Sequence, residues 1–261
     1  MPSLLIVALA AVALGLLFAA TYALAHRMDN YGIVDIAWSY AFGALAVFYA
    51  ATLPGWAPRR WTLAALVLIW SVRLGTHLAI RVLRHHLEED HRYRELRTRW
   101  SDHFAGKMFT FFQQQAASVL LLGLPFFLIG RNPAPAFHPL EYTGAALWLL
   151  ALLGEALADA QLAAFKRDPA NKKRVCDRGL WSASRHPNYF FESCIWLGYF
   201  VIACASPWGW TSVIAPAGIT YLLLRVTGVP MAEAQSLRSR GDAYRAYQNR
   251  VPLFIPWFPK K

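Results

Sequence analysis

Long apolar stretches alternate with short polar segments along most of the 261-residue chain. Seven of them are long enough, or nearly so, for a helix to cross the roughly 30 Å hydrocarbon core of a bilayer. They cover residues 2–25, 33–54, 61–83, 109–130, 140–165, 188–206 and 208–227. Only helices satisfy their own backbone groups in lipid, and the short alternating segments of a transmembrane barrel do not occur. The pattern therefore predicts an all-α polytopic membrane protein, folded as one membrane domain over residues 1–261.

The charged residues predict how these helices are oriented. Only 16% of the chain is charged, and the segments between alternate spans (26–32, 84–108, 166–187 and 228–261) contain 20 of the 26 Lys and Arg residues. The opposite loops contain Arg59, Arg60 and Arg131 alone. Because Lys and Arg accumulate on the cytoplasmic side, we expect the N-terminus outside and the C-terminus in the cytoplasm. The high Ala, Arg, Leu and Trp content is typical of a bacterial chain, which indicates an inner-membrane location.

The same distribution excludes several classes of function. The net charge of +11 comes from short loops beside apolar segments rather than from one basic face, so we expect no binding to nucleic acid. The three cysteines form no CxxC motif and no zinc-ligand spacing, so we expect no metal site. No GxGxxG motif follows a strand and no Walker loop occurs, so a nucleotide would have to be held by membrane helices and their loops.

Ionisable residues within the first three spans are candidates for function, because a charge inside a membrane is costly. Asp35 lies one turn before Ser39, and Tyr40 follows it. Arg73 and His77 share one face of the next predicted helix, over residues 61–83. An Asp35–Arg73 ion pair between helices would be purely structural; the alternative is a role toward a substrate or cofactor.

The later spans contain a second set of polar residues. Glu155 and Asp159 are four residues apart and so share a helix face, which continues to Lys166. Two carboxylates in a membrane helix need cationic or hydrogen-bonding partners, which a polar ligand can supply. The alternative is that Asp159 simply reaches water at the cytoplasmic interface.

The segment after these carboxylates has features of an anion-binding site. Pro187 predicts the first turn of a helix, on which Asn188, Glu192 and Trp196 form one stripe. The free N–H groups of that turn, beside Arg185 and His186, are suited to a phosphate group. Helix capping with interfacial charge is the alternative interpretation.

A final pair of charged residues flanks a Gly–Pro break in the last span. Arg225 precedes Gly228-Val229-Pro230 and Glu233 follows it, so the break is able to turn Glu233 back toward the bundle. A structural role for this pair is equally compatible with the pattern. Together these residues predict a polar, cation-rich pocket in the cytoplasmic half, suited to a nucleotide-like cofactor whose phosphates need Arg and Lys.

Motifs along nearly the whole chain resemble one known family. The longest run is Arg178–Glu192, which contains Arg185-His186-Pro187-Asn188-Tyr189. The others are Tyr31-xxx-Asp35-Ile-Ala-Trp38, Arg73-Leu-Gly-Thr-His77-Leu-xx-Arg81, Glu89-Asp90-His-Arg92-Tyr93, Glu155-xxx-Asp159-Ala-Gln161-xxx-Phe165-Lys166-xx-Pro169-x-Asn171 and Tyr244-xx-Tyr247-xxxx-Pro252-xxx-Pro256. Together they resemble the bacterial branch of the steroid 5-alpha-reductase family. The RHPNY core alone also occurs, in close variants, in membrane isoprenylcysteine and phospholipid methyltransferases.

The resemblance implies an NADPH-dependent reductase whose cofactor lies among the C-terminal helices (131–261) and whose lipid substrate lies near the N-terminal helices (1–130). The positions that match the family's cofactor contacts, or lie beside them, are Asp159, Lys166, Arg174, Arg185, His186, Asn188, Tyr189, Glu192, Trp196, Arg225 and Glu233. The family often has Gly just before the glutamate matching Glu192, where this chain has Phe191. Its bulk is able to narrow the cofactor groove or the substrate channel.

The expected reaction is the reduction of a carbon–carbon double bond conjugated to a ketone, in a steroid-like or isoprenoid lipid. It needs a hydride at the β carbon and a donor that stabilises negative charge on the carbonyl oxygen. Asp35, Tyr40 and His77 are the candidate donors, and Asp35 is preferred. A membrane methyltransferase that uses S-adenosylmethionine is the alternative. The pattern leaves the substrate and the oligomeric state open.

Overall fold

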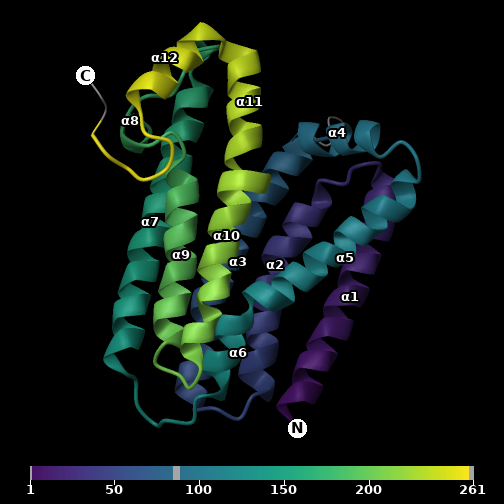
Figure 1. The fold of residues 1–261 in the computed structure, drawn as a ribbon, viewed down its shortest axis with the longest axis vertical. Helices are drawn as coiled ribbons and strands as arrows, with labels where there is room; N and C mark the ends of the chain where they lie inside the picture. Colours follow the sequence, from purple (N-terminus) through teal and green to yellow (C-terminus); the bar gives the residue numbers. More distant parts are fainter. Residues whose placement is uncertain (1, 85–88, 259–261) are drawn as a thin grey trace. The chain divides into compact units, whose positions relative to one another are not determined.

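The chain is helical wherever its structure is described. The computed structural model describes residues 2–84 and 89–258, with the side chains of residues 83 and 84 left out, and no strand occurs among them. The helices, shown in Figure 1, are α1 Ser3–Met28, α2 Ile33–Thr52, α3 Ala57–Arg84, α4 His91–Arg99, α5 Phe104–Leu122, α6 Leu124–Arg131, α7 Pro139–Arg167, α8 Leu180–Ala183, α9 Pro187–Ala203, α10 Ile214–Tyr221, α11 Val229–Arg240 and α12 Asp242–Arg250. Short helical turns cover Pro169–Asn171 and Gly209–Val213, and a π-helix covers Leu222–Val226.

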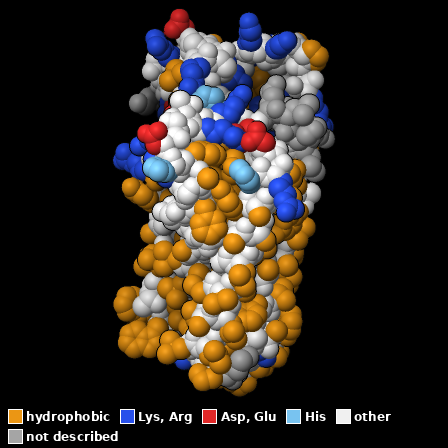
Figure 2. Space-filling model, turned by 90° about the vertical axis from the view of Figure 1, so that its right-hand side faces the viewer, with side chains coloured by type: hydrophobic (Ala, Val, Ile, Leu, Met, Phe, Trp, Pro, Cys, Tyr) orange, Lys and Arg blue, Asp and Glu red, His pale blue; other side chains and the backbone are white. Residues whose placement is uncertain are grey.

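Six helical segments of the described chain are long and apolar enough to cross a membrane. They are Ser3–Met28, Ile33–Thr52, Ala57–Val82, Phe104–Arg131, Pro139–Arg167 and Gly209–Arg240. Each overlaps one of the seven spans predicted from sequence. Hydrophobic side chains cover most of the visible face in Figure 2. The chain is therefore an all-α protein with the helices of an integral membrane protein.

The remaining predicted span, 188–206, corresponds to α9. This helix has 17 residues and so extends only about 25 Å, slightly less than the hydrocarbon core. The seventh crossing, and with it the orientation of the two termini, stays a prediction.

Two of the crossing segments are not single straight helices. Phe104–Arg131 consists of α5 and α6, with a break at Gly123 between them. An added Cβ at Gly123 would lie 2.6 Å from Leu45 Cδ2 and 2.9 Å from the Val119 carbonyl oxygen, so a larger residue would force one of these groups to move. Gly209–Arg240 runs through the π-helix before α11, beyond the end of the predicted span at residue 227.

The chain divides into two compact units. Unit 1 comprises residues 1–137 and 205–212, and its largest helix contacts are of α2 with α3 and of α1 with α5. The α2 and α3 backbones approach closely at Gly43, where an added Cβ would lie 2.7 Å from the Oγ of Ser71. The same hydroxyl donates to the carbonyl of Ser39 at 2.7 Å, which ties the two helices together.

Two arginines that the sequence assigns to outer loops have internal partners in unit 1. The Arg59 side chain is 2% exposed and donates to carbonyls at residues 132, 134 and 136. Arg60 donates to the carbonyls of Ala50 and Leu53 at the end of α2. Both guanidinium groups therefore satisfy backbone carbonyls at that end of the unit.

Unit 2 comprises residues 138–204 and 213–261, and the pair α7 and α9 forms its centre. Glycines allow the two helices to touch. An added Cβ at Gly144 would lie 2.6 Å from Ile202, and one at Gly198 would lie 2.9 Å from Trp148. This close packing brings the polar stripes predicted on α7 and α9 into one interface.

Candidate functional site

The polar residues predicted on α7 and α9 meet between these helices. Asn188 Nδ2 donates to Asp159 Oδ1 at 3.3 Å, and Trp196 Nε1 donates to Glu192 Oε1 at 2.9 Å. Glu155 and Glu192 are 4% and 7% exposed. The structure thus brings together the two stripes that the four-residue spacing predicts.

Phe191, the bulky residue next to Glu192, has a complementary partner on α7. An added Cβ at Gly154 would lie 2.5–2.6 Å from three ring atoms of Phe191. The phenyl ring therefore packs flat on the Gly154 backbone, and its bulk fills helix–helix contact space. The narrowing of a cofactor groove or substrate channel by Phe191 stays a prediction.

The start of α9 is bound to the C-terminal helices through Glu233. Its Oε1 accepts hydrogen bonds from His186 Nε2 at 2.9 Å and from the Tyr244 hydroxyl at 2.7 Å, and it lies 3.2 Å from Arg185 Nε. Its Oε2 accepts from the Gln248 amide. The Gly228–Pro230 break therefore does turn Glu233 toward the α9 terminus. Three donors and the Arg185 guanidinium thus surround this carboxylate, which accounts for its low exposure.

Neighbouring aromatic residues support the same network. The Tyr189 ring stacks on His186, with centroids 5.5 Å apart and planes at 4°. Burial, and then the hydrogen bond to the Glu233 carboxylate, raise the pKa of Tyr244 above its ordinary value. Its hydroxyl therefore remains a donor at neutral pH. The Tyr247 hydroxyl donates to the carbonyl of Trp181, which joins α12 to α8.

A basic pocket of about 360 Å³ lies at the C-terminal end of α7. Two predicted cofactor residues, Lys166 and Arg174, line it. The other lining residues are Phe165, Arg167, Asp168, Pro169, Asn171, Lys172, Lys173 and Arg240. Asp168 is the single acid among them, and its oxygens accept from the Ala170 N–H and the Asn171 side chain at 2.9 and 3.3 Å. Six cationic side chains thus surround one pocket.

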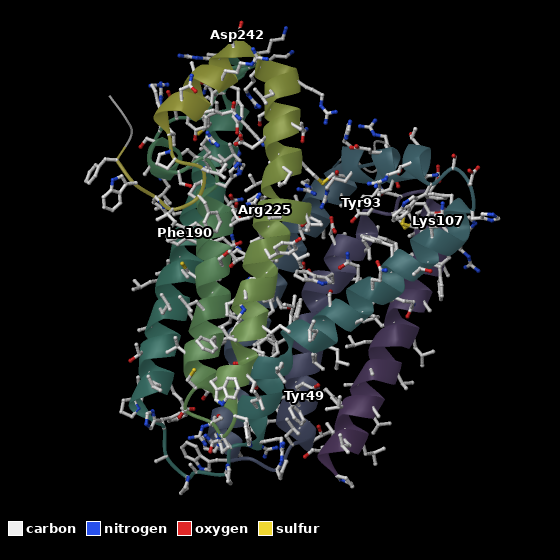
Figure 3. All side chains as sticks on the ribbon, viewed as in Figure 1. Tyr49, Tyr93, Lys107, Phe190, Arg225 and Asp242 are labelled. Carbon is white, nitrogen blue, oxygen red and sulfur yellow. The ribbon has the colours of Figure 1, made fainter. Side chains whose placement is uncertain are left out.

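Part of this pocket could not be found from the sequence. The count of Lys and Arg between residues 166 and 187 indicates a basic loop, which includes Lys172 and Lys173. Arg240 comes from the end of α11, and its Nε donates to the Arg174 carbonyl at 2.9 Å. Arg225 is exposed in the π-helix (labelled in Figure 3), and no contact described for it joins it to the pocket.

In unit 1, Asp35 is held by the segment that begins α4. Arg92 donates to Asp35 Oδ2 at 2.6 Å and the Tyr93 hydroxyl donates to Oδ1 at 2.8 Å. Tyr93 is labelled in Figure 3 and is 2% exposed. The cationic partner of Asp35 is therefore Arg92 on α4, and the predicted Asp35–Arg73 pair is wrong.

The same segment makes a second set of ion pairs. Arg97 donates to Glu89 at 2.8 Å and to Asp29 at 2.6 Å, and the Tyr31 N–H donates to Glu89 at 2.9 Å. Asp90 bonds Arg92 and also Arg81 at the end of α3. The Glu89-Asp90-His-Arg92-Tyr93 motif thus binds the helix ends of unit 1 together.

The other catalytic candidates have separate surroundings. The Tyr40 hydroxyl lies 3.0 Å from Thr76 Oγ1, and its ring covers Gly75, where an added Cβ would approach ring atoms to 2.8–2.9 Å. His77 is exposed. Asp35 contacts α4 instead, so the structure does not bring these three side chains to one point of unit 1. Their catalytic roles stay predictions.

Comparison with known proteins gives the family of the chain. A family model described as "Protein of unknown function (DUF1295)" matches residues 21–251. The chain belongs to this family. The matched range, residues 21–251, includes Asp35, the α7–α9 stripes, Glu233 and all ten residues that line the pocket. No curated protein and no solved structure matches the chain.

Proposed function

We propose that this chain is a membrane-embedded, NADPH-dependent reductase of a carbon–carbon double bond conjugated to a ketone, in a steroid-like or isoprenoid lipid. The resemblance of its motifs to the steroid 5-alpha-reductase family motivates the proposal. The basic pocket at the end of α7 is the observation that supports it best, since it places six cations beside one acid.

The chemistry of the pocket fits a dinucleotide that bears phosphates. Arg and Lys are the side chains that bind phosphate oxygens with charge-assisted hydrogen bonds. In this proposal Lys166 and Arg174 bind a phosphate of NADPH, and Asp159 and Asn188 provide polar contacts along the α7–α9 face. The cofactor supplies the hydride for the β carbon.

The pocket also bears on the alternative function. S-adenosylmethionine has two positive groups, a sulfonium and an ammonium, and one negative carboxylate. A pocket with six cations therefore repels its net positive charge. Glu233, the acid nearest the position that methyltransferases use, already accepts hydrogen bonds from three side chains and forms an ion pair with Arg185. These two features favour a phosphate-bearing cofactor over a methyl donor.

The residues proposed for the substrate lie in unit 1. Asp35, Tyr40 and His77 are the candidates that stabilise negative charge on the carbonyl oxygen as the hydride arrives. Because Arg92 and Tyr93 both donate to the Asp35 carboxylate, Asp35 is suited to orient the Tyr93 hydroxyl more than to donate a proton itself. The apolar spans provide access for a lipid substrate from the bilayer, and the pocket is assigned to the cytoplasmic side by the positive-inside pattern.

Calorimetry of the purified protein in detergent tests the cofactor. We expect NADPH to bind, and Lys166→Gln and Arg174→Gln each to weaken binding about tenfold, the loss of about one charge-assisted hydrogen bond. Arg245→Gln is the matched control, because Arg245 is 73% exposed on α12. Binding of S-adenosylmethionine without binding of NADPH would overturn the proposal. If Lys166→Gln and Arg174→Gln bind NADPH as tightly as the control Arg245→Gln, the pocket is not the cofactor site.

A further inference from the structure

The C-terminal segment Leu253–Phe258 displays large apolar side chains although its backbone is bound to the protein. Ile255, Trp257 and Phe258 are 65%, 69% and 81% exposed, and Leu253 is 39% exposed. Phe254, between Leu253 and Ile255, is turned inward, with its ring centroid 5.7 Å from that of Phe190. One side of the segment packs on unit 2, and the other exposes these four apolar side chains.

Backbone hydrogen bonds fix this segment to the connection between α8 and α9. The Arg185 N–H donates to the Pro252 carbonyl at 2.9 Å, and the Ser184 hydroxyl donates to the Phe254 carbonyl at 2.7 Å. The Trp257 N–H donates to the Ala183 carbonyl at 2.9 Å. These bonds hold the exposed side chains in place, so their exposure is a property of the fold.

The depth of this connection follows from its bond to α7. Trp181 Nε1 donates to the Ala158 carbonyl at 2.9 Å. Ala158 lies nine residues before the end of the candidate span at Arg167, about 13 Å along the helix axis. Leu153 and Leu157 of the same helix are 58% and 51% exposed. The connection, to which the C-terminal segment is bonded, is therefore attached to α7 at a level where that helix exposes apolar side chains.

We propose that Leu253–Phe258 is an interfacial anchor, in which Leu253, Ile255, Trp257 and Phe258 insert into the bilayer beside α7. Aromatic and aliphatic side chains are stable at the boundary between headgroups and hydrocarbon, and Trp is enriched there. Two hydrogen bonds of the anchor, at Phe254 and Trp257, and one of the adjoining Pro252 hold Ala183–Arg185, the residues that lead into α9. This role does not depend on the reaction that the protein catalyses.

Spin-label accessibility in lipid nanodiscs of phosphatidylethanolamine and phosphatidylglycerol tests the anchor. Single cysteines replace Ile255 or Trp257, and Arg245→Cys on α12 is the matched exposed control, in a full-length chain whose Cys176, Cys194 and Cys204 are Ala. We expect labels at 255 and 257 to collide with oxygen and to lose collisions with a water-soluble nickel chelate. The label at 245 shows the reverse.

Two results would overturn the anchor. Nickel collisions at 257 equal to those at 245 would place the segment in water. Exclusion of both reagents at 255 and 257 would mean that protein, such as a second copy of the chain, covers it. If the background without cysteines does not fold, the same three positions are labelled in the natural background and the signal of the unsubstituted chain is subtracted. NADPH binding is unaffected by either result, so the anchor and the cofactor are tested separately.

Discussion

At the scale of single residues, the most informative contact is that of Phe191 with Gly154. From the sequence alone, the phenyl ring of Phe191 beside Glu192 is compatible with a narrowed cofactor groove. In the structure it occupies the space left by a missing Cβ on α7. Residue 191 therefore belongs to the helix pair, and its size is matched to residue 154.

Substitution of Gly154 tests this match. Gly154→Val forces the Phe191 ring to move, and we expect a loss of about 2 kcal/mol of stability, as is usual for overpacked contacts. Combined with Phe191→Ala, the same substitution should cost much less than the two single losses added. Thermal unfolding in detergent measures both, with Gly106→Val as control because an added Cβ at Gly106 has no neighbour within 4 Å. Additive losses would contradict the contact.

Glu233 is a second residue whose role is set by its contacts. Glu233→Ala leaves three hydrogen-bond donors without their acceptor and Arg185 without its ion-pair partner, and we expect a loss of about 3 kcal/mol. Glu95→Ala is the control, because Glu95 is 61% exposed. Unchanged thermal stability together with weakened NADPH binding would instead assign Glu233 to the cofactor.

At the scale of elements, α4 shows what a sequence pattern cannot predict. The six crossing segments follow from hydropathy, because the bilayer imposes the length of each apolar run. Helix α4 is short and polar, and its position depends on ion pairs with Asp29 and Asp35, more than fifty residues away. The same holds for the basic pocket. Lys166 and Arg174 can be identified from the sequence as cations of one loop, whereas Arg240 reaches the pocket only because the chain folds.

The α4 ion pairs predict a pH dependence of stability. Burial by itself raises the pKa of Asp90, but the hydrogen bonds and charge of Arg92 outweigh it and lower that pKa below its ordinary value. A lowered folded pKa contributes stability above about pH 4, and this contribution is lost as pH falls through the folded pKa. We expect Asp90→Asn to lose stability at neutral pH and to show a shallower acid decline.

Thermal unfolding at several pH values between about 3 and 7 measures that decline, because this range includes the ordinary carboxyl pKa of about 4. Asp102→Asn is the matched control, because Asp102 is exposed at the end of the same connection. An acid decline for Asp90→Asn as steep as that of the natural chain would show that the Asp90 pairs do not stabilise the fold.

At the scale of the whole molecule, the number of crossings decides on which sides the termini lie. Six crossings place both termini on one side, whereas a crossing by α9 as well places them on opposite sides. The positive-inside pattern predicts the second arrangement, with the C-terminus in the cytoplasm. Fusion of a topology reporter to each terminus measures this. Reporters active on the same side would show that α9, with its 17 residues, does not cross.

Transfer of deuterium tests the central proposal, that of a lipid enone reductase, most directly. The purified protein in nanodiscs receives NADPH deuterated on the hydride-donating carbon, S-adenosylmethionine with a labelled methyl group, and bacterial lipid extract with a steroid and an isoprenoid enone. Mass spectrometry of the lipids should find deuterium on the carbon β to the ketone, and less of it with Arg174→Gln than with Arg245→Gln. Labelled methyl groups in a lipid, with no deuterium in any, would contradict the reductase.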